Sequence, residues 1–99
     1  MKKAVVLFDE RFELSEKFRV ELRALQVVQS KKHPEGVKVS FALIDVENGV
    51  PKLVIDNHAP FGFHMHTKLP EDKDVRVLLA VSTYQEAYAI FMEEVEKRV

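Results

Sequence analysis

The chain has 99 residues, 46% of them hydrophobic and 31% charged, which is typical of one globular domain, residues 1–99. Its formal net charge of -1 excludes a global basic field, so any contact with RNA would have to be local. Because cysteine is absent, disulfides, thiol catalysis and cysteine-based zinc sites are excluded, and no apolar segment reaches the length of a membrane span. We therefore expect a soluble, cytoplasmic protein without membrane contact.

The first predicted element is a short strand. Residues 3–8 are rich in valine and bounded by charge, which favours a strand covered on both faces. The charged residues Asp9, Glu10 and Arg11, followed by Ser15, indicate a turn region after it.

Residues 17–24 alternate strictly between charged and apolar side chains, which predicts a strand with one buried face and one wet face. Apolar residues within 14–28 also occur at helical spacing, so a helix is the alternative. We favour the strand because a helix would place Val20 and Val27 on its wet side. The alternation breaks after Ala24, which indicates a β-bulge near residues 24–25.

The middle of the chain predicts a hairpin and the C-terminal part a helix. Residues 30–36 form a charged loop, residues 37–46 alternate as a strand, and Asn48-Gly49 is a strong hairpin signal leading into residues 52–55. After a last strand over residues 75–81, Thr83 and the glutamate three positions later have the form of a capping box. The fold class expected is α+β: a mainly antiparallel sheet of about five strands with one C-terminal helix packed on it.

Residues 56–66 hold three of the four histidines together with adjacent Asp56 and Asn57. If the two arms of this stretch pair through a five-residue loop, residues 59–63, His58 lies opposite His64 and Asp56 opposite His66. Successive side chains of a strand point to opposite faces, so this register gives one face with three imidazoles and a carboxylate.

Three uses of this face remain open. His58, His64, His66 and Asp56 could bind a divalent metal such as zinc. Alternatively, His64 and His66 could serve as general base and general acid in metal-independent RNA cleavage. The third interpretation is a non-enzymatic protein-interaction module.

In one form of the third interpretation, the protein is structural and binds a partner through an apolar surface. Phe61, Phe63 and Met65 would line the contact surface, for example of a homodimer. On this hypothesis the histidines are ordinary surface residues without a chemical role.

The spacing of Asp56-Asn57, Gly62 and His64-x-His66 resembles the Asp-Asn…Gly-x-His-x-His motif of the TumE-like family. These are small prokaryotic proteins, the toxin components of toxin–antitoxin pairs. The resemblance extends over most of the chain, although the motif spacing is its most specific part. Many relatives have a charged, glycine-rich run after the Asn, whereas here the run before Gly62 is apolar.

This resemblance implies an α+β domain with cytotoxic activity, but it does not fix the reaction. Combined with the acid–base hypothesis for His64 and His66, it favours a toxin that acts as an RNA-directed nuclease. His64, His66, Asp56 and Asn57 would be its catalytic residues. It also implies a neighbouring antitoxin, a DNA-binding protein, as partner. The alternative remains a non-enzymatic metal-binding or interaction module.

Overall fold

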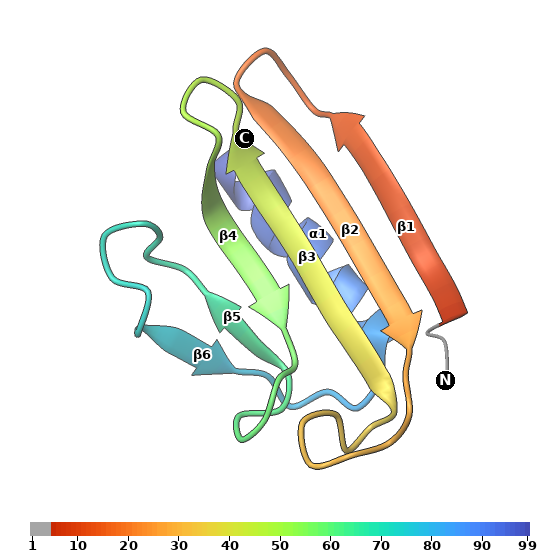
Figure 1. Cartoon of the computed structure of the whole chain (residues 1–99). Helices are drawn as coiled ribbons and strands as arrows, with labels where there is room; N and C mark the ends of the chain where they lie inside the picture. Colours follow the sequence, from red (N-terminus) through yellow and green to blue (C-terminus); the bar gives the residue numbers. More distant parts are fainter. Residues whose placement is uncertain (1–4) are drawn as a thin grey trace.

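The computed structural model describes residues 5–99 and shows an antiparallel sheet with one helix packed against it (Figure 1). The six strands follow one another in chain order across the sheet, so each pairs with its neighbours in sequence. The elements are β1 (Val5–Glu13), β2 (Phe18–Gln26), β3 (Val37–Asp45), β4 (Val50–Asp56), β5 (His64–His66), β6 (Arg76–Leu78) and α1 (Tyr84–Arg98). The predicted α+β class is confirmed, with six strands in place of about five.

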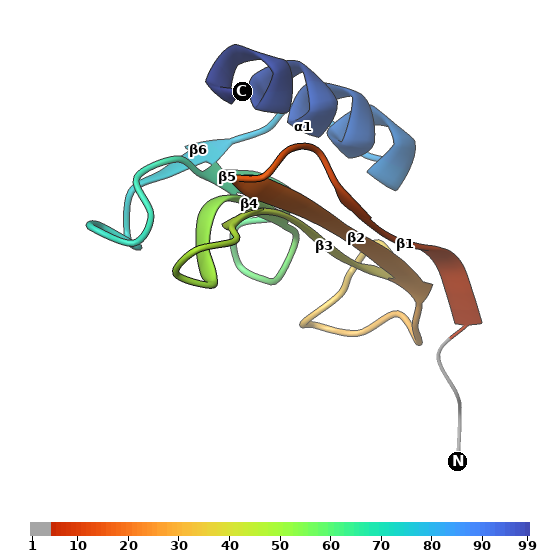
Figure 2. The ribbon, with the colours of Figure 1, turned by 90° about the horizontal axis from the view of Figure 1, so that it is seen from above.

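Helix α1 covers one face of the sheet and leaves the other face uncovered by any helix of residues 5–99 (Figure 2). The helix begins after Thr83, whose hydroxyl accepts a hydrogen bond from the Glu86 amide while the Glu86 carboxylate accepts one from the Thr83 amide, so the capping box is confirmed. Its buried stripe consists of Ala87, Phe91 and Val95, at helical spacing. No helix among residues 5–99 is both long and apolar enough to cross a membrane.

The hydrophobic core lies between α1 and the central strands. Its fully buried side chains come from alternate positions of β2, β3 and β4, because only every second residue of a strand faces the helix. They include Val20, Leu22, Ala24, Val39, Phe41, Leu43, Leu53 and Ile55. The strand prediction for residues 17–24 is therefore confirmed over its helical alternative.

The Asn48-Gly49 turn joins β3 to β4 as predicted, with Gly49 at a φ of 67°. This positive φ is open to glycine without the steric cost that a side chain would incur. The last predicted strand, residues 75–81, is shorter in the structure, since β6 spans three residues. Its partner β5 is equally short, so few ladder positions are available to it.

The prediction for the N-terminal strand is wrong in two respects; its residues 3 and 4 lie outside the described residues. Strand β1 continues to Glu13, through the predicted turn at Asp9 to Arg11, and it is a largely exposed edge strand rather than one covered on both faces. Cross-strand charge pairs account for the continuation, because Asp9 lies opposite Arg23 and Arg11 opposite Glu21.

The β-bulge expected near residues 24–25 lies on the neighbouring strand. Ala24 and Leu25 pair with β3 without interruption, while the register with β1 shifts between Val6 and Phe8. The register shift thus lies opposite Ala24 and Leu25, where the bulge was predicted, but the extra residue belongs to β1.

Candidate metal centre

The hairpin of β4 and β5 differs from the predicted register by two residues. Asp56 lies opposite His64, and His66 lies opposite Val54, whereas the prediction set His58 opposite His64 and Asp56 opposite His66. The reason is Asn57: it leaves the strand and binds β3, so the connection spans residues 57–63 rather than 59–63. A shift of two residues preserves side-chain parity, so the predicted face with its carboxylate and imidazoles still forms.

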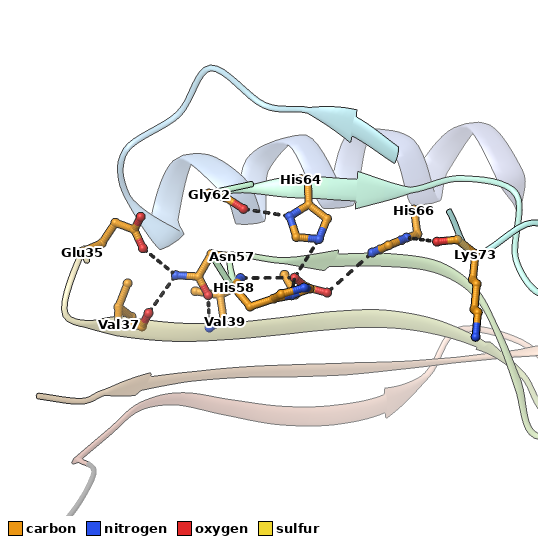
Figure 3. A network of polar contacts seen from close by, with 10 residues as sticks. Glu35, Val37, Val39, Asn57, His58, Gly62, His64, His66 and Lys73 are labelled. Atoms are coloured by element: carbon orange, nitrogen blue, oxygen red, sulfur yellow. Dashed lines mark hydrogen bonds and ion pairs between the residues drawn. The ribbon is translucent and has the colours of Figure 1, made fainter. Parts of the chain in front are cut away.

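On this face, Asp56 is the common neighbour of all three imidazoles. The imidazoles are those of His58, His64 and His66, which Figure 3 labels. Its Oδ1 lies 2.9 Å from Nε2 of His64 and 2.7 Å from Nδ1 of His58, and its Oδ2 lies 3.7 Å from Nε2 of His66. The rings of His64 and His66 meet edge to face with their centroids 4.9 Å apart.

Backbone carbonyl oxygens accept hydrogen bonds from Nδ1 of the two histidines in β5, His64 and His66. Nδ1 of His64 donates to the carbonyl oxygen of Gly62 at 2.8 Å, and Nδ1 of His66 donates to that of Lys73 at 3.0 Å. A carbonyl oxygen can only accept, so both Nδ1 atoms carry the proton. In the neutral rings, each Nε2 therefore presents a lone pair.

Three lone-pair donors thus converge without a proton between them. Nε2 of His64, Nε2 of His66 and a carboxylate oxygen of Asp56 all lie within 4.8 Å of one another. Although Nε2 of His64 is 2.9 Å from Asp56, the contact lacks the geometry of a hydrogen bond, and this buried atom has no other hydrogen-bond partner among residues 5–99. Converging acceptors repel one another unless a cation lies between them.

Burial sets the protonation state of His64. Its side chain is fully buried, and this loss of solvation is the largest influence, lowering its pKa below the ordinary value of 6.5. The carbonyl of Gly62 and the carboxylate of Asp56 raise the pKa of His64, whereas the two neighbouring imidazoles lower it. The net lowering favours the neutral ring at neutral pH, which is the form that binds metal.

His58 lies outside the converging group. Its Nδ1 and its backbone amide both donate to Oδ1 of Asp56, and its side chain is 55% exposed. Because Nδ1 is engaged with the carboxylate, the ring orients Asp56, in the manner of residues that position metal ligands.

Asn57 also points away from the histidines. Its side chain is buried, where Oδ1 accepts from the amide of Val39 at 2.9 Å and Nδ2 donates to the carbonyl of Val37 at 2.7 Å and to Glu35 at 3.1 Å. The side-chain amide of Asn57 is therefore occupied by bonds away from the histidines. Asn57 lies beside the site and supports the backbone next to Asp56.

Two side chains that the sequence analysis did not assign to the site pack over it. The ring of Phe61 packs edge to face on His64 with centroids 5.5 Å apart, and the Arg76 guanidinium carbon lies 4.0 Å from the centroid of Phe61. The anchoring carbonyls of Gly62 and Lys73 also escaped prediction. Every residue has a backbone carbonyl, so residue type does not predict which carbonyl anchors a histidine. The turn at Gly62, with a φ of 65°, is predictable from the glycine itself.

The apolar interface expected from Phe61, Phe63 and Met65 does not form a surface. Phe63 is 3% exposed and Met65 6% exposed, and both belong to the hydrophobic core, so only Phe61 remains accessible.

Comparison of the chain with protein-family models, with curated proteins and with solved structures finds no match. The TumE-like resemblance of the motif stays a prediction, and the functional argument rests on the site itself.

Proposed function

We propose that this protein binds one divalent metal ion, with zinc as the reference ion, through Nε2 of His64, Nε2 of His66 and the carboxylate of Asp56. The observation that carries the proposal is the convergence of these three lone-pair donors while both Nδ1 atoms are committed to backbone carbonyls. Metal-ligating histidines ordinarily donate their second nitrogen in this way, which fixes the ring and its tautomer.

The spacing of the donors supports a small ion. Zinc lies about 2.0–2.2 Å from nitrogen and oxygen ligands, so two ligands of a tetrahedral site are roughly 3.3 Å apart. The two distances from Asp56 to the imidazoles lie on either side of this value and start from different oxygens. Oδ1 lies 2.9 Å from Nε2 of His64, and Oδ2 lies 3.7 Å from Nε2 of His66. Rotation of the Asp56 side chain, which is partly exposed, would bring one of its oxygens to the ligand spacing from both imidazoles.

With only three protein ligands, a bound zinc ion would keep a position open for water or a substrate atom. A zinc ion held by these three residues would lower the pKa of a bound water to about 7 and would so supply the chemistry of metal-assisted hydrolysis near neutral pH. The centre can therefore support hydrolysis, and Asp56 and His66 are partly exposed, which gives access from their side.

The toxin-type RNA-directed nuclease predicted from the sequence is the second candidate, and we propose it in a metal-dependent form. A metal-independent acid–base pair would need Nε2 of both His64 and His66 at the RNA, but His64 is fully buried and its Nε2 faces Asp56. An ion held by the same three residues would instead present hydroxide to the phosphodiester. The antitoxin partner belongs to this candidate and stays a prediction.

Metal content and metal titration test the first proposal. Wild-type protein and a His33→Ala control, whose histidine lies in the loop of residues 30–36, should each bind about one zinc ion per chain. The double variant His64→Ala/His66→Ala should bind none. At a free metal concentration 100 times the Kd, the wild type should gain about 2.7 kcal/mol of stability, which corresponds to a rise in Tm of roughly 10–20 °C for a chain of this size. Equal metal content in wild type and double variant would refute the site.

RNA cleavage tests the second candidate. Metal-loaded wild type should degrade RNA, while EDTA-treated protein and the double variant should not. Cleavage that survives EDTA but is lost in the double variant would instead support the acid–base pair. No cleavage by metal-loaded protein would leave a metal-binding module without nuclease activity.

A further inference from the structure

The two edges of the sheet differ in how much unpaired backbone they expose. Strand β6 ends one edge with three residues, whereas β1 ends the other with nine (Figure 1). No strand among residues 5–99 pairs with the outer side of β1. Natural edge strands are usually protected by shortness, by charged side chains, by proline or by β-bulges. Strand β6 is short, whereas β1 is long and contains neither lysine nor proline. The register shift of β1 lies near its start, between Val6 and Phe8, and residues 8–13 pair without interruption.

The central segment of β1 is complementary to itself. It has the sequence Phe8-Asp9-Glu10-Arg11-Phe12, in which Glu10 is flanked on one side by Asp9 and on the other by Arg11, with a phenylalanine beyond each. When two such segments run antiparallel with Glu10 opposite Glu10, each Asp9 lies opposite an Arg11 and each Phe8 opposite a Phe12.

We propose that two copies of this chain pair through their β1 strands, antiparallel, around a two-fold axis at Glu10. The pairing joins the two sheets into one of twelve strands. Because the axis is perpendicular to the sheet, the helices of both copies lie on the same face, and side chains that are directly opposite share a face.

Charge complementarity identifies the partner as a second copy. Within each chain, Asp9 already lies opposite Arg23 and Arg11 opposite Glu21 on the open face of the sheet. Across the dimer these become two rows of four charges, each alternating in sign: Arg23, Asp9, then Arg11 and Glu21 of the second copy. Opposite charges directly across an antiparallel pair are favourable, and like charges are not.

On the sheet face that α1 covers, the paired β1 strands would bring together phenylalanines and one pair of like charges. Phe8 and Phe12 are partly buried against the core, and Phe8 meets Tyr88 edge to face at a centroid distance of 5.4 Å. A second strand would cover their exposed remainder and set Phe8 beside Phe12 twice. Glu10 is exposed and lies opposite its own copy, which weakens the dimer.

The proposal is independent of the metal centre. Strands β4 and β5, which hold the proposed ligands, are separated from β1 by β2 and β3 in the sheet order. The double variant His64→Ala/His66→Ala should therefore dimerise like the wild type.

The Glu10 contact supplies the test, because this side chain lies opposite Leu22 within its own chain and has no charged partner there. Sedimentation equilibrium should show a concentration-dependent dimer in the wild type. Removing the like-charge contact in Glu10→Gln should lower the dimer Kd roughly two- to fivefold. Glu93→Gln, on the exposed face of the helix, is the matched control and should leave the dimer Kd unchanged.

Mixing wild type with Glu10→Lys tests the position of the axis. Each protein alone has a like-charge contact, whereas the mixed dimer has a Glu–Lys contact, so native mass spectrometry with one protein isotope-labelled should show more than the statistical half of mixed dimers. A mixture with Glu93→Lys should stay statistical. A monomer at all concentrations, or statistical mixing of the Glu10 pair, would overturn the proposal.

Discussion

The sharpest structural prediction concerns Asn57, which the sequence places among candidate catalytic residues and the structure places in a supporting network. Replacing it with alanine removes three hydrogen bonds, two of them to the backbone of β3 at Val37 and Val39. Residue 57 is 1% exposed, so water does not readily replace the lost partners. The amide of Val39 and the carbonyl of Val37 would then be buried without partners.

The expected cost follows from these two groups. An unsatisfied buried polar group costs about 1–3 kcal/mol, so for two groups we expect Asn57→Ala to lower the free energy of unfolding by about 2–6 kcal/mol. Typical domains have only about 5–15 kcal/mol in total. In urea, with an m-value of about 1–2 kcal/mol/M, the midpoint should fall by at least about 1 M.

Urea unfolding followed by circular dichroism measures this loss. Asn48→Ala, in the exposed β3–β4 turn, is the matched control and should change the stability by no more than about 0.5 kcal/mol. If Asn57→Ala were equally mild and yet abolished RNA cleavage by the metal-loaded protein, Asn57 would be a catalytic residue and the structural interpretation would be refuted.

Three further outcomes are expected. Gly62→Ala should cost about 1–2 kcal/mol, measured by urea unfolding, because a φ of 65° is unfavourable for a side chain; an unchanged midpoint would contradict that strain. Thr83→Ala should lower the free energy of unfolding by about 1 kcal/mol through loss of the helix cap. Thermal melts of this variant, with Ser82→Ala as the comparison, measure the loss. Because burial lowers the pKa of His64, the unfolded chain binds more protons than the folded one below pH 6.5, so metal-free protein should lose stability as the pH falls from 6.5 through the lower folded pKa. His64→Gln should reduce this dependence in unfolding curves at pH 7.5 and 5, and an equal dependence in both proteins would count against His64 as its source.

Local patterns predicted those features that depend on neighbours in sequence. The alternation of residues 17–24 indicated a half-buried strand, and the spacing of Thr83 and Glu86 indicated a capping box, because each is decided within a few residues. The face shared by Asp56 and His64 was also predictable, since a register error of two residues does not change parity.

Features that depend on distant contacts were not predictable. The ladder of β4 ends at Asp56 because Asn57 bonds to Val37 and Val39, some 20 residues earlier in the chain, and no local pattern contains that contact. The same holds for the edge position of β1, which local valine content suggested would be covered on both faces.

The sequence by itself determined that a carboxylate and several imidazoles gather on one side of one hairpin, because strand periodicity is a local property. Only the tertiary structure decided which of them converge. Two backbone carbonyls fix the lone pairs of His64 and His66, burial keeps His64 neutral, and His58 is left to orient Asp56. Such directions depend on where the loops close against the sheet, and that geometry is set by long-range packing rather than by residue type.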